Sequence, residues 1–295
     1  MTGSEPTPLS ADGPLAIDAL RRLRATARLG RTIHYFDSLD STNTLAHGLA
    51  SEGAAEGTTV IAETQTKGRG RLGRTWVSPP FRNLYVSIVL RPPIAVARAP
   101  QIGLVAGVAV AEAVRDWAPQ ATIKWPNDVL IDGRKVAGIL TEMDADGDCV
   151  RCVIVGIGVN LNSVAAEFPP DLRDKATSLS AAVGVRIDRV AFADRLLARL
   201  EERYDRFLDQ GFAAIQPLWE RLSALTGRVV QIDDGVRSYQ GIVVGLADDG
   251  TLRLRDTVQG ETRVVAGDVT VVDGYGGSGE RPAVGADREA GERNR

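Results

Sequence analysis

The region from residue 123 to residue 162 limits the possible folds of this chain more than any other part of the sequence. It contains two Asp-Gly pairs, Asp132-Gly133 and Asp146-Gly147, each placed next to runs of aliphatic residues. An Asp-Gly pair in this setting is a strong signal for a tight β-hairpin. Successive hairpins give antiparallel pairing, whereas a doubly wound parallel sheet needs helical crossovers between its strands. The region therefore predicts an antiparallel or mixed sheet.

Patterns on either side of this region predict elements that extend and cover the sheet. Three earlier strands are expected at residues 32–36, 58–63 and 84–90, and the last alternates as a half-buried strand does. Helices are expected where apolar residues recur at helical spacing, at residues 14–28, 43–49, 101–117, 192–207 and 215–225. The expected fold class is α+β.

The pattern changes at residue 228, where short strands alternate with tight turns. These strands predict a small all-β domain of roughly fifty residues, joined without a long linker. Residues 1–13 and 274–295 have the composition of disordered segments. No apolar run approaches the roughly 20 residues of a membrane span, and no basic segment followed by an apolar one opens the chain. Cytoplasmic residence is therefore expected.

Residues 64–76, Thr-Gln-Thr-Lys-Gly-Arg-Gly-Arg-Leu-Gly-Arg-Thr-Trp, have the composition of an anion-binding loop. They include three glycines, four cations and Trp76. Glycines let the backbone approach a ligand, arginine forks bind phosphate or carboxylate oxygens, and an indole offers a flat face to a heteroaromatic ring. The loop therefore predicts a site for a nucleotide or an acyl phosphate.

Three other interpretations of this loop fit less well. A Walker A loop needs Lys in place of Arg74 and a helix directly behind it, but Pro79 and Pro80 follow instead. Arg-Gly-Arg runs also occur in nucleic-acid-binding arms, yet a net charge of −3 and a pI of about 5.6 disfavour a general phosphate binder. A solvated surface loop leaves the neighbouring motifs unexplained.

Polar residues inside apolar strands form the second set of candidates. Lys124, Asp128 and Lys135 lie in predicted strands, and a buried ammonium needs an acidic partner or an anionic ligand. Asn160 ends another buried strand, where its amide suits the donor and acceptor edge of a base. The polar residues 37–43 are expected to form a turn that caps the following helix.

Two further motifs are interpreted as structural. Cys149 and Cys152 form a lone C-x-x-C in a predicted strand, where residues three apart point to opposite faces, so both are assigned to packing. Gly156-x-Gly158 begins like a dinucleotide-binding turn, but the third glycine would fall at Leu161 and no acidic ribose partner follows at the required distance.

In their order along the chain, these motifs resemble the signature of the bacterial biotin protein ligases. They are Ser41-Thr42-Asn43, Gln65, Gly68-Arg69-Gly70-Arg71-x-Gly73-Arg74, Lys124-Trp125-Pro126-Asn127-Asp128, Lys135-x-Ala137-Gly138-Ile139-Leu140 and Gly156-x-Gly158-x-Asn160-Leu161. The resemblance implies a biotin/lipoate ligase catalytic domain with a class II synthetase-like fold at 31–225 and a small C-terminal β-barrel at 226–273. An N-terminal lead with a short helix at 1–30 and a disordered tail at 274–295 complete the expected organisation.

The resemblance also implies an activity. Such enzymes activate biotin with ATP to biotinyl-AMP, release pyrophosphate, and transfer biotin to a lysine of the biotin carboxyl carrier protein, a domain of acetyl-CoA carboxylase or a related carboxylase. The residues suit this chemistry, because a carboxylate that attacks the α-phosphorus of ATP needs fixed cations and Mg²⁺ to screen the repulsion.

Residue roles follow from the match of each motif. The positions implied to bind biotin are Ser41, Thr42, Asn43, Gln65, Arg69, Gly70, Arg71 and Lys135. The positions implied to bind ATP are Arg69, Arg71, Arg74, Trp76, Lys124, Asn127, Asp128 and Asn160. Lys135 and Arg71 are the implied catalytic residues, and Asp128 is the candidate to orient either Mg²⁺ or the incoming lysine.

Two alternatives stay open. Lipoate–protein ligase shares the catalytic fold and reaction logic, although Gln65 with the glycine-arginine loop and the Lys-Trp-Pro-Asn-Asp run favour biotin. A nucleic-acid-binding module is the alternative from another class. Some biotin protein ligases carry an N-terminal winged helix-turn-helix, and residues 1–30 are too few for one. An enzyme-only form that does not bind DNA is therefore expected, as a monomer or a homodimer.

Overall fold

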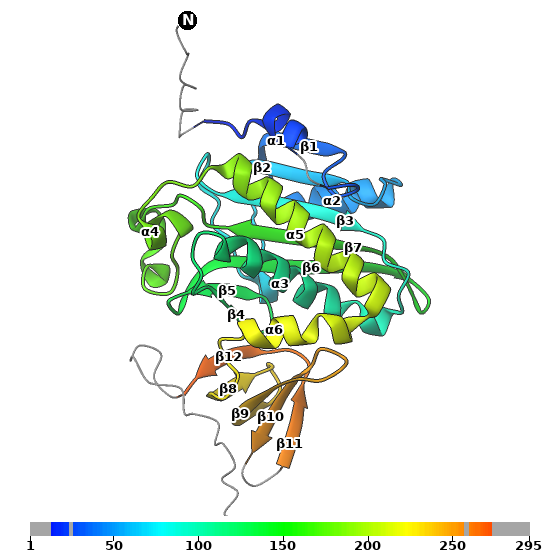
Figure 1. Ribbon diagram of the computed structural model, residues 1–295, viewed down its shortest axis with the longest axis vertical. Coiled ribbons are helices and arrows are strands. Elements are labelled where there is room, and N and C mark those ends of the chain that lie inside the picture. The colour runs from blue at the N-terminus through cyan, green and yellow to red at the C-terminus, as the bar shows by residue number, and fades with distance from the viewer. Residues whose placement is uncertain (1–12, 24–25, 257–259, 273–295) are drawn as a thin grey trace, which may run out of the picture.

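A computed structural model describes residues 13–23, 26–256 and 260–272 of the chain. The predicted disordered tail at 274–295 and residues 1–12 of the predicted lead lie outside the described residues. The described chain forms a larger α+β part and a smaller all-β part, which are stacked along the long axis of the molecule (Figure 1).

The larger part is built on one mixed seven-stranded sheet. Its spatial order is β1 (Ile33–Leu39), β2 (Thr59–Gln65), β3 (Leu84–Leu90), β7 (Cys149–Val159), β6 (Arg134–Asp146), β5 (Asp128–Ile131) and β4 (Thr122–Lys124). Only the pair β1 and β2 is parallel among these strands, and every other neighbouring pair is antiparallel. The mixed sheet predicted from the hairpin signals is confirmed.

Both predicted hairpins are present. Asp132 and Gly133, between β5 and β6, have positive φ values of 49° and 76°, as a type I′ turn requires. Gly147, between β6 and β7, has a φ of 58°. These two turns place β5, β6 and β7 side by side, so that motifs separated along the chain meet on one surface.

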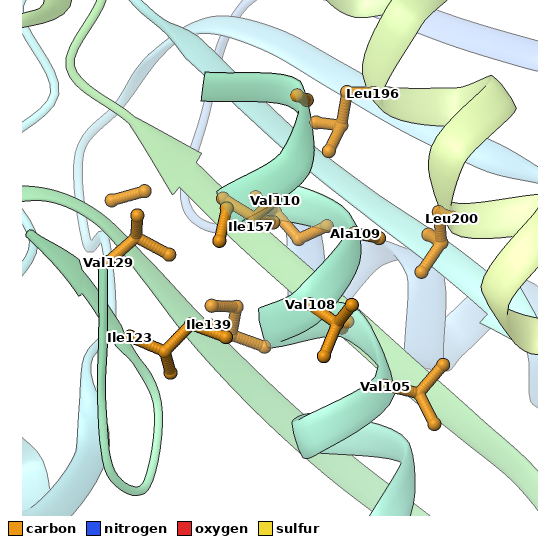
Figure 2. Packing of buried hydrophobic residues seen from close by; sticks show 14 of the residues in the cluster. Val105, Val108, Ala109, Val110, Ile123, Val129, Ile139, Ile157, Leu196 and Leu200 are labelled. Carbon is orange, nitrogen blue, oxygen red and sulfur yellow. The ribbon is translucent and has the colours of Figure 1, made fainter. Parts of the chain in front are cut away.

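Helices cover both faces of the sheet. On one face, α3 (Pro100–Arg115) packs against the strands, and α5 (Arg189–Gln210) packs on α3, as Figure 1 shows. Figure 2 shows Val108 of α3 between the sheet residue Ile139 and Leu200 of α5. The other face holds α2 (Thr42–Ser51) over β2, β3 and β7. The remaining α-helices are α1 (Ile17–Leu23), α4 (Leu179–Val183) and α6 (Gln216–Leu222).

Several local predictions are corrected by this arrangement. Strand β3 is buried along its whole length, not half-buried, because it is central and covered on both faces. Residues 37–39, predicted as a turn, continue strand β1. The first helix covers only Ile17–Leu23 of the predicted 14–28. Cys152 is buried as predicted, whereas Cys149 is exposed; both are free thiols.

The segment Val96–Arg115 also differs from expectation. By length and composition it is apolar enough to cross a membrane, although no such run was predicted. Its window is 67% buried, and it packs between the sheet and α5. Such burial is typical of a core helix in a globular protein.

The smaller part is a five-stranded antiparallel sheet with the order β11 (Gly260–Val264), β10 (Leu252–Asp256), β9 (Ser238–Leu246), β8 (Val229–Asp233) and β12 (Asp268–Val271). Among the described residues, the edge strands β11 and β12 are not paired with each other, so the closed barrel is not seen. Helix α6 joins the two parts. Glu220 Oε1 accepts the Leu246 N–H at 3.0 Å, and Gln216 Nε2 donates to Leu246 O at 2.9 Å.

Candidate active site

A cavity of about 1230 Å³ lies where the sheet, the glycine-arginine loop, residues 168–176 and strand β12 meet. Every residue predicted from the sequence as a site residue lines it, namely Ser41, Thr42, Asn43, Gln65, Arg69, Gly70, Arg71, Arg74, Trp76, Lys124, Asn127, Asp128, Lys135 and Asn160. The fold thus brings together side chains that are 119 positions apart at the extremes, Ser41 and Asn160. Their individual roles stay predictions.

Glycines of the sheet lie under two side chains that line this cavity, Trp76 and Asn43. A Cβ atom on Gly158 would lie 2.5 Å from Trp76 Cε2, and one on Gly156 would lie 2.0 Å from Asn43 Oδ1. Gly138, on the neighbouring strand, would place a Cβ 2.9 Å from the Trp76 ring. Only glycine permits this close approach. The Gly-x-Gly motif therefore accommodates side chains that lie flat on a sheet, which agrees with rejecting a dinucleotide-binding turn.

One end of the cavity is polar and is formed by the start of α2 and the end of β2. Gln65 Oε1 accepts the Thr42 N–H at 2.8 Å and lies 3.1 Å from Thr42 Oγ1. Ser41 occupies the N-cap position, but its side chain makes no capping hydrogen bond. The capping role expected of this polar cluster is thus performed by Gln65 from another strand, and the Ser41 hydroxyl is not used as a cap.

Behind this end lies a buried polar row that sequence reasoning missed. Ser87 Oγ of β3 is 2.7 Å from Thr42 Oγ1 and 2.6 Å from Asn43 Oδ1. Asn43 Nδ2 donates to Leu140 O at 3.2 Å and to Glu142 Oε2 at 2.8 Å. Thr42, Asn43 and Ser87 are all at most 4% exposed. A hydroxyl in an otherwise apolar central strand was the available signal for Ser87.

The glycine-arginine loop is closed by its own backbone. Trp76 N donates to Gly68 O at 2.9 Å, and Gly70 N donates to Arg74 O at 2.7 Å. Leu72 has a φ of 55° inside a single 3₁₀ turn, and the next regular element is strand β3, not an α-helix. The structure therefore also rejects the Walker A interpretation.

Each arginine of the loop reaches a different element. Arg69 Nη2 lies 2.7 Å from Glu142 Oε2 of β6, and Arg71 Nη1 donates to Asn127 Oδ1 at 3.2 Å. Arg74 forms an ion pair with Asp268 of β12. The loop thus connects the seven-stranded sheet with the five-stranded C-terminal sheet, a link for which the sequence carried no signal.

Trp76 is half-buried, and its ring lies on Gly138 and Gly158 of the sheet. Its Nε1 is buried and has no hydrogen-bond partner in the described part of the chain. Lys135 Nζ lies 5.3 Å from the ring centroid and 2.6 Å from Asp128 Oδ1. The lysine is therefore held between a carboxylate and an aromatic face.

The cavity has an excess of positive charge. Six cations and four carboxylates line it, a net charge of +2 in a chain whose overall net charge is −3. Burial lowers the pKa of Lys124 and of Arg71, and the nearby carboxylates of Asp128 and Asp268 oppose that shift at both groups. Cations kept in partly desolvated positions favour an anionic ligand.

Two asparagines, Asn127 and Asn160, also line the cavity. Asn160 Nδ2 donates to Thr177 O at 3.2 Å, and Asn127 Nδ2 donates to Ile139 O at 2.9 Å. Sequence reasoning missed residues 168–176 and 267–271, which also line the cavity. These segments carry no motif of their own, and only the fold places them there.

The biotin/lipoate A/B protein ligase family model matches residues 35–160. The bifunctional ligase/repressor BirA of Bacillus subtilis is 40% identical over 258 residues, which cover 87% of this chain and 79% of that protein. The biotin–[acetyl-CoA-carboxylase] ligase of Paracoccus denitrificans is 39% identical over 222 residues, covering 73% and 91%. The structure of a biotin protein ligase from Aquifex aeolicus in complex with biotin and ATP has a TM-score of 0.70 at 31% identity, covering 81% and 98%.

Proposed function

This chain belongs to the biotin protein ligases within the biotin/lipoate A/B protein ligase family, and from that membership we propose how its cavity works. The reaction activates biotin with ATP to biotinyl-AMP and then transfers biotin to a lysine of a carrier protein. The observation that carries the proposal is a single cavity with a polar hydrogen-bonding end, a half-buried indole on the sheet and a net charge of +2. Such a cavity suits a small ring with a carboxylate tail next to a nucleoside triphosphate.

The polar end receives the ureido ring of biotin. Thr42 and Gln65 supply hydroxyl and amide groups there, and Ser41 lines the same end. Gly156 lets the Asn43 side chain lie close to the sheet at this end. This placement directs the carboxylate tail toward Lys135 and the loop.

The cations of the cavity are assigned to the place where the biotin carboxylate meets the phosphates of ATP. A biotin carboxylate oxygen attacks the α-phosphorus of ATP, the bond to the β-phosphate oxygen breaks, and pyrophosphate leaves. Lys135 is assigned to the reacting oxygens, Arg71 to the loop that closes over biotin and the phosphates, and Lys124 and Arg74 to the remaining phosphates. Fixed donors aimed at developing charge supply a large part of such catalysis. The face of Trp76 and the Asn160 amide are assigned to adenine.

We assign a single role to Mg²⁺, which would screen the phosphate charge when ATP is bound. Among the described residues, no group of three or more His, Cys, Asp or Glu side chains could hold a metal ion. Mg²⁺ is commonly held by one or two carboxylates together with substrate phosphates. Asp128 lines the cavity beside Lys135 and is the carboxylate assigned to it.

Transfer completes the proposed cycle. The amine of a carrier lysine attacks the carbonyl carbon of biotinyl-AMP, and AMP leaves. We propose that the carrier is the biotin carboxyl carrier domain of acetyl-CoA carboxylase or a related carboxylase, in the cytoplasm. The relative from Paracoccus is named for that carboxylase. The domain limits 31–225 and 226–273, and a monomer or homodimer, are further parts of the proposal.

Pyrophosphate exchange into ATP tests the proposal and its rival. Exchange is measured with biotin, with lipoate and with neither, and biotin-dependent exchange is the expected result. Lipoate-dependent exchange would favour the lipoate ligase alternative. Fluorescence anisotropy with operator DNA at physiological salt tests whether the chain also binds DNA, and only weak, sequence-indifferent binding is expected of a chain with net charge −3.

A further inference from the structure

Asp268 is a carboxylate that the C-terminal sheet places in the cavity of the larger part. It begins strand β12, lines the cavity and forms an ion pair with Arg74 of the glycine-arginine loop. The residue before it, Gly267, has a φ of 155°, and a Cβ atom there would lie 2.5 Å from Ile232 Cγ2 and 2.9 Å from Asp233 O. A backbone conformation that only glycine permits therefore fixes the position of Asp268.

The negative charge of Asp268 acts on two further cations of the cavity. Burial lowers the pKa of Arg71, and among the effects that oppose this lowering the charge of Asp268 is the largest. Burial also lowers the pKa of Lys124, where Asp128 opposes the lowering most and Asp268 next. One carboxylate of the C-terminal sheet thus interacts with cations from the loop and from strand β4.

These cations are the ones assigned to the loop over the phosphates and to the phosphates themselves. A phosphate that binds Arg74 needs the guanidinium that Asp268 already engages, and it brings negative charge close to that carboxylate. Like charges at short distance repel, and the repulsion is screened less where the groups are partly buried. Asp268 and a phosphate therefore compete for Arg74.

The ion pair is one that a ligand can open. The side chains of Arg74 and Asp268 are 64% and 45% exposed, and ion pairs with such exposure contribute little to stability. The C-terminal sheet is also attached away from the cavity, where Gln101 Nε2 donates to Asp248 O at 3.0 Å and helix α6 binds Leu246. Separation of Asp268 from Arg74 leaves these contacts intact.

We propose that Asp268 is an autoinhibitory counter-ion, which pairs with Arg74 until the phosphates of ATP displace it. The carboxylate lowers the affinity for ATP, because its ion pair must be broken when the phosphates bind. It also favours the departure of pyrophosphate, because Asp268 can pair with Arg74 again as the phosphates leave. This inference rests on the proposed function, since it takes ATP as the ligand of these cations.

Titration calorimetry with α,β-methylene-ATP tests the sign of the effect. This analogue cannot release pyrophosphate, so its binding can be measured in the presence of saturating biotin. Asp268→Ala removes the charge and the acceptor, whereas Asp268→Asn removes the charge but keeps an acceptor for Arg74. We expect both variants to lower the Kd of the analogue, Asp268→Ala by about 3- to 5-fold, the size expected for a partly exposed charge pair. Loss of a merely structural contact would raise the Kd instead.

The matched control is Asp249→Asn. Asp249 also forms a partly exposed ion pair in the C-terminal part, with Arg263 at 3.9 Å, but it is not among the residues that line the cavity. This variant should keep the Kd of the analogue within about 2-fold of the parent value. The Kd of biotin should be unchanged in all three variants, because Asp268 acts on the phosphate-binding cations.

Salt provides a second measurement of the same competition. The gain in affinity of Asp268→Asn over the parent should shrink as the salt concentration rises from about 0.05 M to about 0.5 M, because mobile ions screen the repulsion. A gain that does not depend on salt would show that charge is not its cause and would contradict the counter-ion role.

A parental or higher Kd of the analogue in the Asp268 variants would overturn the inference. A rise that occurs only with Mg²⁺ present would assign Asp268 to the metal ion, and a rise with or without Mg²⁺ would make Asp268 a residue that positions Arg74. A parent protein that binds neither biotin nor the analogue contradicts the proposed function itself. A parent that binds both without any dependence on Asp268 contradicts only the counter-ion role.

Discussion

Lys135 Nζ lies 2.6 Å from Asp128 Oδ1, although the two residues are on different strands and Asp128 pairs in register with Gly138. The β5–β6 hairpin makes this contact possible, with a register shift between Val129 and Leu130. The ammonium also faces the Trp76 ring at 5.3 Å. A lysine held from two sides has a defined position before any ligand binds, and this reduces the reorganisation needed when charge develops.

Replacing Lys135 with Ala should therefore impair the chemical step. We expect biotin-dependent pyrophosphate exchange to fall by ~10²-fold or more, because a fixed donor at developing charge is worth a few kcal/mol. Circular dichroism should show an intact fold. Arg195→Ala, which removes a surface ion pair with Asp116, is the control and should exchange like the parent. Near-parental exchange in Lys135→Ala would refute the assignment.

Arg71 is expected to retain the intermediate rather than to form it. Arg71→Gly removes the guanidinium that binds Asn127 and adds a glycine to the loop. Biotinyl-AMP should still form, because Lys135 is unchanged. It should dissociate faster and biotinylate bystander lysines, because the closed loop holds the intermediate in the site and excludes water. Dissociation of radiolabelled biotinyl-AMP measures this.

The matched control for that variant is Leu72→Gly, which also adds a glycine but keeps the guanidinium. Leu72 has a φ of 55°, a conformation that glycine adopts without strain. We expect Leu72→Gly to hold biotinyl-AMP longer than Arg71→Gly does. If Arg71→Gly makes no biotinyl-AMP, or retains it as long as the parent, the retention role is wrong.

The sequence indicated the fold and most of the cavity because the relevant signals were local. Asp132-Gly133 needs only the geometry of a two-residue turn, and the glycine-arginine loop carries its chemistry in consecutive residues. Glu142 and Asp268 were not found because each acquires its partner only through the fold. Glu142 meets Asn43 across 99 positions, and Asp268 meets Arg74 across 194. The position of the glycine-arginine loop could not be predicted either, because it depends on ion pairs with carboxylates from two different sheets.

Glu63 is a buried carboxylate whose contribution should be to stability. It is 1% exposed and accepts from Arg189 Nη2 at 2.7 Å, from Tyr35 at 2.7 Å and from the Leu15 N–H at 2.6 Å. Glu63→Gln leaves Arg189 buried without a counter-charge. We expect this change to lower the free energy of unfolding by about 3–5 kcal/mol, measured by urea denaturation.

The control for the stability prediction is Glu261→Gln in the C-terminal sheet. Glu261 also pairs with an arginine, Arg253, at 2.6 Å, but this pair is solvent-exposed. Exposed ion pairs are screened by water and salt, so the control should cost far less than Glu63→Gln. Equal losses in the two variants would show that burial does not strengthen the Glu63 interaction.

We expect the buried Lys124 ammonium to lower the stability of the fold while it serves to bind ATP. The pH dependence of the stability tests this. Burial lowers the pKa of Lys124 from its ordinary value of 10.5. Below the lowered pKa, both the folded and the unfolded chain carry the proton, and the folded chain bears the full cost of the buried charge. As the pH rises from the lowered pKa toward 10.5, the unfolded chain binds more protons than the folded chain, so stability due to this group rises.

Lys124→Met removes that cost while keeping an unbranched side chain that is only one atom shorter. At neutral pH we expect the melting temperature to rise by about 2–4 °C, which corresponds to ~1 kcal/mol in a protein of this size. The rise should shrink as the pH approaches the ordinary lysine pKa, and the Kd for ATP should increase because a phosphate-binding cation is lost. Lys67→Met is the control of opposite sign: a hydrogen bond from Lys67 to Asp40 raises the Lys67 pKa, so its removal should not stabilise the fold. A lower melting temperature for Lys124→Met at neutral pH would show instead that Asp128 and Asp268 more than offset the cost of burying the ammonium.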